Sequence, residues 1–137
     1  MAGYSGVPLI KKLGIKAGSR LLLVSPPEGF EQTLGPLPDE AAIVAPGVRG
    51  KIDVVLLFVL SEKDFQKQFA RLAARLQPAG GLWVCWPKKA AKIETDLTED
   101  VVRRVGLESG LVDNKVCAVD ETWSGLRFVV RLKDRQK

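Results

Sequence analysis

Seven consecutive apolar residues, Val54 to Leu60, are the feature that most constrains the fold of this chain. An apolar run of this length without polar alternation is typical of a strand buried on both faces, at the centre of a parallel sheet. Arg20 to Ser25 and Leu82 to Trp86 predict two further buried strands. Ser61 to about Gln77 follows the central strand and places apolar residues on one side of a helix and cations on the other. Strands that alternate with such helices predict an α/β fold.

The rest of the chain completes this pattern. Additional helices are predicted at Val7 to Leu13, at Phe30 to Leu34 and from Asp96 onward, and additional strands at Ala41 to Ala45, Lys115 to Val119 and Leu126 to Leu132. The last two strands are joined by a polar hairpin, and a connection this short makes the final strand antiparallel. With right-handed crossovers, we expect a doubly wound, Rossmann-like, three-layer fold of about six strands in the order 2-1-3-4-6-5. A chain of 137 residues fits a single domain, residues 1–137.

Composition excludes several kinds of chemistry. The chain has no histidine, so it has no Ser-His-Asp or Cys-His device and no histidine-ligated metal site. Cys85 and Cys117 are predicted to be buried free thiols, and two cysteines are too few for a zinc site. We therefore assign no catalytic residue, no metal and no cofactor. The apolar runs are too short to cross a membrane and the N-terminus lacks a signal-peptide core, so we expect a cytoplasmic protein without membrane contact.

The connection after the first predicted strand differs from a phosphate-binding loop. Such a loop is rich in glycine and offers backbone N–H groups to the ligand. This chain has Pro26 and Pro27 there, which have no N–H, followed by Glu28, which repels an anion. We therefore expect weak binding or none for S-adenosylmethionine and for dinucleotides.

Residues 50–132 resemble the C-terminal half of class I methyltransferases. The resemblance lies in strands that lead to Gly80-Gly81-Leu82-Trp83-Val84, then a helix, a Gly-Leu pair, a strand and an antiparallel final strand. It implies the fold of those enzymes. The three segments that would hold the methyl donor or the substrate are different here, and they read Pro26-Pro27-Glu28, Ala45-Pro46 and Ser61-Glu62-Lys63-Asp64. The resemblance is therefore to a truncated methyltransferase fold without the cofactor loop.

The whole chain also resembles a family of small bacterial proteins defined only as a domain of unknown function. The residues that carry this resemblance are Ala2 to Gly6, Lys12 to Lys16 and Trp123 to Phe128. It implies no particular activity.

One edge of the predicted sheet is a candidate ligand site. Ligands of open α/β sheets bind at the carboxyl ends of the strands, and this edge collects what we call the rim: Glu28, Ser61, Trp86, Lys88, Lys89 and Trp123. Indole rings and lysines at one rim could hold a small anionic or planar ligand. The favoured alternative is that Trp123 closes the core and ordinary surface charges surround it.

Two groups of cations are candidates for contact with nucleic acid. Spacing by four residues aligns one group along a helix face, where it could meet phosphates: Lys63, Lys67, Arg71 and Arg75. Asp64 interrupts this stripe and no aromatic residue lies among its cations, so a solvated helix face is the favoured interpretation. The same interpretation applies to the opening cluster, Lys11, Lys12, Lys16 and Arg20.

Three functions fit these observations. The favoured hypothesis is a non-catalytic module that binds a small anionic ligand or a protein partner. The second is a divergent, methyltransferase-like transferase. The third is a basic nucleic-acid-binding protein, which a net charge of +5 permits but does not require.

Overall fold

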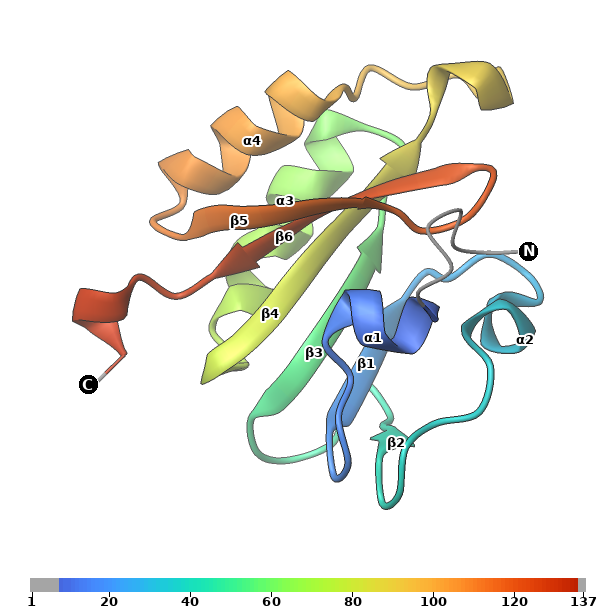
Figure 1. The fold of residues 1–137 in the computed structure, drawn as a ribbon. Coiled ribbons are helices and arrows are strands. Elements are labelled where there is room, and N and C mark those ends of the chain that lie inside the picture. The colour runs from blue at the N-terminus through green and yellow to red at the C-terminus, as the bar shows by residue number, and fades with distance from the viewer. Residues whose placement is uncertain (1–7, 136–137) are drawn as a thin grey trace.

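The strand order of the sheet confirms the predicted topology. The computed structural model describes residues 8–135, and its sheet has the order β2-β1-β3-β4-β6-β5 (Figure 1). β6 is antiparallel to both of its neighbours, and the other neighbouring strands are parallel. In chain order the elements are α1 (Leu9–Leu13), β1 (Arg20–Val24), α2 (Phe30–Leu34), β2 (Ala42–Ile43), β3 (Ile52–Phe58), α3 (Glu62–Ala73), β4 (Leu76–Pro87), η1 (Lys89–Ala91), α4 (Glu99–Glu108), β5 (Val112–Ala118), β6 (Trp123–Val129) and η2 (Leu132–Asp134). Val7, the predicted start of the first helix, and the segment Ala2 to Gly6 lie outside the described residues.

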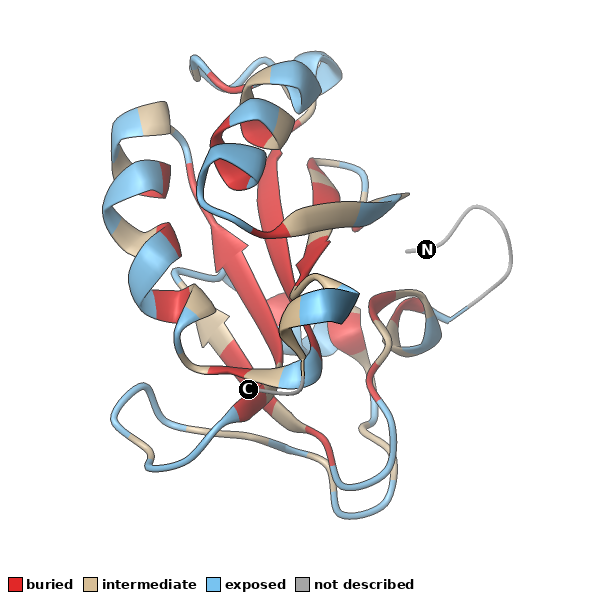
Figure 2. Cartoon of the chain, turned by 90° about the vertical axis from the view of Figure 1, so that its left-hand side faces the viewer, coloured by how far each residue is buried: buried red, intermediate tan, exposed pale blue. Residues whose placement is uncertain are grey.

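Helices cover both faces of the sheet. α3 and α4 pack on one face, where the ring of Phe69 meets the ring of Phe128 edge-on at 5.3 Å between centroids. α1 and α2 pack on the other face, around a cluster that includes Leu13 and Trp83. The central strands β3, β4 and β6 are largely buried, as their red colour in Figure 2 shows. This burial on both faces is why the central strands are apolar without alternation.

α3 is shorter than its sequence pattern predicts. It ends at Ala73 rather than near Gln77, because the chain joins β4 at Leu76, which pairs with Ile52 at the start of β3. Its predicted N-terminal cap is present, since the Ser61 hydroxyl accepts a hydrogen bond from the Asp64 N–H at 3.1 Å.

The final hairpin is tighter than predicted. The carboxylate of Asp120 accepts hydrogen bonds from the backbone N–H groups of Thr122 and Trp123, both at 2.8 Å. An Asp side chain that closes a turn in this way replaces a longer loop. β6 consequently begins at Trp123 instead of Leu126.

β2 contains only two residues, and an irregular loop leads from it to β3. Ala42 and Ile43 pair with the first two residues of β1, so β2 does not extend to the carboxyl end of the sheet. Two guanidinium groups hold the loop: Arg20 donates to the carbonyls of Arg49 and Lys51, and Arg75 donates to those of Pro46 and Val48. These hydrogen bonds satisfy carbonyls that a helix would otherwise have paired.

The two cysteines are free and lie on the strands that flank β6. Cys85 of β4 and Cys117 of β5 both pair with Gly125, from opposite sides. Cys85 is buried, and burial raises the pKa of its thiol well above the usual value, with smaller contributions from Cys117 and Asp120. Cys117 is only partly buried, which corrects the prediction that both thiols are fully enclosed.

None of the helices between residues 8 and 135 combines the length and the apolar composition that a membrane crossing requires.

Gly106 brings α4 unusually close to the sheet. A Cβ at this position would lie 2.1 Å from the ring of Phe128, which is completely buried. Although alanine is favoured over glycine in a helix by about 1 kcal/mol, we expect Gly106→Ala to destabilise the fold by about 1–3 kcal/mol through overpacking. Urea unfolding followed by circular dichroism measures the difference. Gly47→Ala, whose Cβ would meet nothing within 4 Å, is the matched control and should be neutral. Unchanged stability of Gly106→Ala would contradict the close contact.

Candidate functional site

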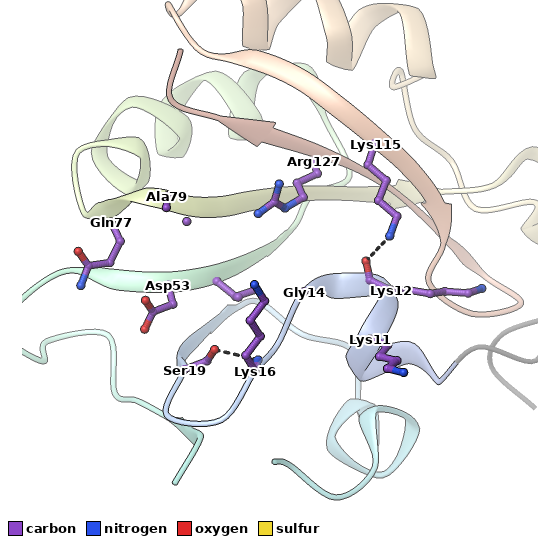
Figure 3. Close-up of a pocket in the computed structure, with 12 residues that line it drawn as sticks. Lys11, Lys12, Gly14, Lys16, Ser19, Asp53, Gln77, Ala79, Lys115 and Arg127 are labelled. Carbon is purple, nitrogen blue, oxygen red and sulfur yellow. Dashed lines mark hydrogen bonds between the residues drawn. The ribbon is translucent and has the colours of Figure 1, made fainter. Parts of the chain in front are cut away.

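A pocket of about 430 Å³ lies on the face of the sheet that carries α1, near the amino ends of β3 and β4 (Figure 3). We call it the basic pocket, because it is lined by one carboxylate, Asp53, and by five cations: Lys11, Lys12, Lys16, Lys115 and Arg127. The formal charge of these six side chains is therefore +4. A concave surface of one sign concentrates ions of the opposite sign.

Two glycines of β4 shape the floor of the basic pocket. Ile52 pairs with Leu76 and Val54 pairs with Gly81, so β4 advances five positions while β3 advances two. The bulge brings the backbones together at Gly80, where a Cβ would lie 2.6 Å from the carbonyl oxygen of Asp53. Only glycine fits so close an approach.

Gly81 has a different role, because it lies beneath the side chain of Arg127. A Cβ at Gly81 would lie 2.3 Å from Nε of Arg127, so the missing side chain lets the guanidinium rest against β4. Arg127 is half-buried, and its guanidinium has no hydrogen bond or ion pair with another described residue. Burial lowers the pKa of Arg127 from its ordinary value, and the nearby charge of Arg135 lowers it further. The group stays protonated, and among the described residues no carboxylate forms an ion pair with it.

The opposite wall of the basic pocket is held in place by hydrogen bonds. Nε1 of Trp83 donates to the carbonyl of Leu13 at 3.0 Å, and Nζ of Lys115 donates to the carbonyl of Lys12 at 3.0 Å. Gly14 then ends α1 with a φ of 79°, a conformation that favours glycine. These contacts fix α1 against the sheet, so its lysines have a defined place relative to Arg127.

Asp53 does not neutralise the cations of the basic pocket through an ion pair. Its carboxylate accepts a hydrogen bond from the backbone N–H of Arg20 at 2.8 Å, which joins β3 to the start of β1. The pocket can therefore attract and hold an anion. The hydroxyl of Ser19, which also lines the pocket, accepts a hydrogen bond from the backbone N–H of Lys16 at 3.0 Å. The described part of the chain has no group of three or more His, Cys, Asp or Glu side chains that could hold a metal ion.

The two tryptophans of the predicted rim lie on opposite faces of the sheet. Trp86 is packed in the core beneath α3 and α4, whereas Trp123 packs in the other core, edge-on against Phe58 at 5.2 Å between centroids. Pro87, not Trp86, is the register partner of Trp123, so the two indoles occupy successive positions of the pleat. The structure therefore does not bring both rings to one surface.

The polar members of the rim have separate roles. Nζ of Lys88 donates to the carbonyl of Asp120 at 2.7 Å and supports the hairpin, and Ser61 caps α3. Glu28 and Lys89 are exposed. The rim as a ligand site stays a prediction.

The stripe on α3 is not uniform either. Lys63 and Lys67 are exposed, and Arg71 donates to Oε1 of Gln68 at 2.9 Å. Arg75 holds the loop between β2 and β3 through its guanidinium. The stripe as a nucleic-acid surface also stays a prediction.

The basic pocket is the site that the sequence did not reveal. Lys11, Lys12 and Lys16 form a cluster in the sequence, but their pattern favours a solvated helix face. Arg20, the fourth member of that cluster, holds the loop between β2 and β3. The remaining signal is Arg127, the one charged residue of β6, which lies on the same face of the strand as Gly125. Because Arg127 is far from α1 in the sequence, the sequence does not show that these cations line one pocket.

The strand order, with an antiparallel β6 between β4 and β5, defines a Rossmann-like α/β fold of the methyltransferase type. No protein-family model and no curated protein matches the chain. Solved structures do. A SAM-dependent methyltransferase from Aquifex aeolicus is 16% identical with a TM-score of 0.59, over 90% of this chain and 88% of that one. The fibrillarin pre-rRNA processing protein of Methanococcus jannaschii is 10% identical with a TM-score of 0.62, over 94% and 71%. The ribosomal protein L11 methylase of Lactobacillus delbrueckii subsp. bulgaricus is 11% identical with a TM-score of 0.60, over 90% and 75%. These likenesses establish the fold alone.

Proposed function

We propose that this chain is a non-catalytic binding module, a single domain over residues 1–137, that holds a small anionic ligand in the basic pocket. The observation that carries the proposal is the guanidinium of Arg127, half-buried and without an anionic partner among the described residues, in a pocket with four lysines and one carboxylate. A buried charge is normally paired. An anionic ligand would supply the missing partner.

The edge of the sheet that holds S-adenosylmethionine in methyltransferases supports the same proposal by its poor fit. Pro26 and Pro27 lack N–H groups, and the N–H of Phe30 already donates to the carbonyl of Pro27 at 3.1 Å. β2 ends at Ile43, opposite Leu21, well before the carboxyl end of β1. Few donors and a shortened second strand leave little to bind a methyl donor, so we place the ligand in the basic pocket instead.

Removing the Arg127 charge should weaken anion binding. We expect inorganic pyrophosphate to raise the melting temperature of the protein, and we expect Arg127→Gln to weaken its affinity by about 10- to 100-fold, because hydrogen bonds to charged groups contribute about 1.5–3 kcal/mol. Calorimetry at fixed ionic strength measures the affinity. Lys92→Gln removes the same charge at an exposed position directly after η1, outside the pocket lining, and should leave the affinity unchanged.

Two outcomes would contradict the proposed site. Pyrophosphate that binds neither the native protein nor its variants would exclude an anion site in the basic pocket. Binding that is lost in Lys89→Gln but kept in Arg127→Gln would place the ligand at the rim.

A divergent transferase is the second candidate, because the solved structures with this fold include methyltransferases. Its test is calorimetry with S-adenosylmethionine. Micromolar affinity that is lost when Gly29 is replaced would favour this candidate over a non-catalytic module.

The cytoplasmic location and the resemblance to the small bacterial family stay predictions. Of the residues that carry that resemblance, Ala2 to Gly6 lie outside the described residues.

A further inference from the structure

We infer that the group recognised in the basic pocket is a chain of two or more phosphates in a small molecule, and that the pocket makes no specific contacts with the rest of that molecule. This inference rests on the proposed function, since it identifies the chemical class of the anion that the same pocket binds. Three features of the described residues carry it: the arrangement of the cations, their number, and the kinds of side chain that line the pocket.

The cations of the basic pocket differ in the direction of their side chains. Arg127 and Lys16 point toward each other from opposite sides of the cavity, one from β6 and one from the loop after α1 (Figure 3). The side chains of Lys11 and Lys12 extend from α1 away from that inner pair. A single phosphate between Arg127 and Lys16 would leave the outer lysines without an anion. A longer phosphate chain would extend from the inner pair toward α1, where Lys11 and Lys12 would have to turn to meet it.

Lys115 lies between Arg127 and α1. Its Nζ donates to the carbonyl of Lys12 at 3.0 Å, and an ammonium group has three donors, so two remain for a ligand. β5 presents Lys115 directly opposite Arg127 of β6, on the same face of the sheet. Lys115 thus links Arg127, its register partner, to the last turn of α1.

The charge of the basic pocket favours more than one phosphate. Five cations and Asp53 give a formal charge of +4. A single phosphate monoester carries about −1.5 to −2 at neutral pH, so it would offset at most about half of this charge. Each further phosphate brings additional negative charge to the cations that remain.

The remaining lining argues against recognition of a base or of single-stranded nucleic acid. No aromatic side chain is among the described residues that line the basic pocket. Proteins that bind single strands stack the bases on aromatic rings and follow the backbone along a groove. The basic pocket has the charge for phosphates but no surface for stacking, so we expect a nucleotide to bind through its phosphates alone.

A series of phosphate chains tests the inference. We expect the affinity measured by calorimetry at fixed ionic strength to rise by about tenfold or more from phosphate to pyrophosphate and again to tripolyphosphate, as additional charge-assisted hydrogen bonds form. ATP without magnesium should bind about as tightly as tripolyphosphate. Lys16 is exposed, so Lys16→Gln should fold normally and should weaken tripolyphosphate binding. Lys92→Gln is the control that should not, because Lys92 is exposed and does not line the pocket.

Gly81→Ala tests the position of Arg127 without changing any charge. The added Cβ would collide with the guanidinium, which is the mobile end of its side chain, so Arg127 must move while the sheet persists. We expect weaker tripolyphosphate binding with a nearly unchanged melting temperature. Unaltered affinity would show that Arg127 does not hold the ligand from this position.

The possible failures are distinguishable. Equal affinities for phosphate and tripolyphosphate would overturn the inference and leave the proposed anion site standing. Citrate that binds as tightly as tripolyphosphate would overturn the phosphate class in favour of a polycarboxylate. An oligothymidylate that binds more tightly than tripolyphosphate at equal phosphate concentration would point to nucleic acid. If none of these anions binds, both the inference and the proposed function are wrong.

Discussion

Trp83→Ala should lower the free energy of unfolding by about 3–5 kcal/mol, the range for truncation of a large buried aromatic side chain. The indole of Trp83 is fully buried between the sheet and α1, and its Nε1 donates to the carbonyl of Leu13 at 3.0 Å. Alanine leaves a cavity and an unpaired carbonyl at the end of α1. Urea unfolding followed by circular dichroism measures the loss.

Trp83→Phe separates the two contributions to this loss. Phenylalanine keeps most of the ring volume but cannot donate to Leu13, and a buried acceptor without a partner costs about 1–3 kcal/mol. We expect an intermediate stability. If Trp83→Ala unfolds within about 1 kcal/mol of the native protein, the packing of α1 on the sheet is much weaker than its burial indicates.

Trp123→Ala should also lower the free energy of unfolding by about 3–5 kcal/mol, because only 9% of Trp123 is exposed and its ring packs against Phe58. Pyrophosphate affinity should not change, since Trp123 is not among the residues that line the basic pocket. Unfolding and calorimetry on the same variant measure both quantities.

The opposite result for Trp123→Ala would have a definite meaning. A variant of near-native stability that loses its ligand would identify Trp123 as part of a binding surface. That outcome would favour the rim over the basic pocket.

The topology could be predicted because each step depended on local pattern. The apolar run from Val54 to Leu60 identified a strand buried on both faces, and the short polar connection after β5 required an antiparallel final strand. Ser61 was recognisable as a helix cap because a cap depends on residues a few positions apart. These signals involve neighbours in sequence.

Element boundaries were less predictable because tertiary hydrogen bonds determine them. Pairing of Leu76 with Ile52 ends α3 early, and the Asp120 carboxylate starts β6 early. β2 was predicted at Ala41 to Ala45 but covers only Ala42–Ile43, because only the start of β1 pairs with it. A propensity for strand or helix does not contain this information.

The basic pocket could not be predicted because it depends on a bulge and on a distant pairing. The register shift between β3 and β4 brings their backbones together at Gly80, and the β4–β6 pairing then places Arg127 above Gly81. Neither event has a signature in the residues of α1. The charged residues of the pocket were visible in the sequence, but their convergence was not.

The placement of the two cysteines prevents an internal disulfide bond. Because Cys85 and Cys117 pair with Gly125 from opposite sides, two strand spacings of about 4.8 Å separate their backbones. A disulfide requires Cα atoms within about 7 Å of each other. The two thiols therefore cannot form an internal disulfide without disrupting β6, and the stability of the sheet does not depend on such a bond.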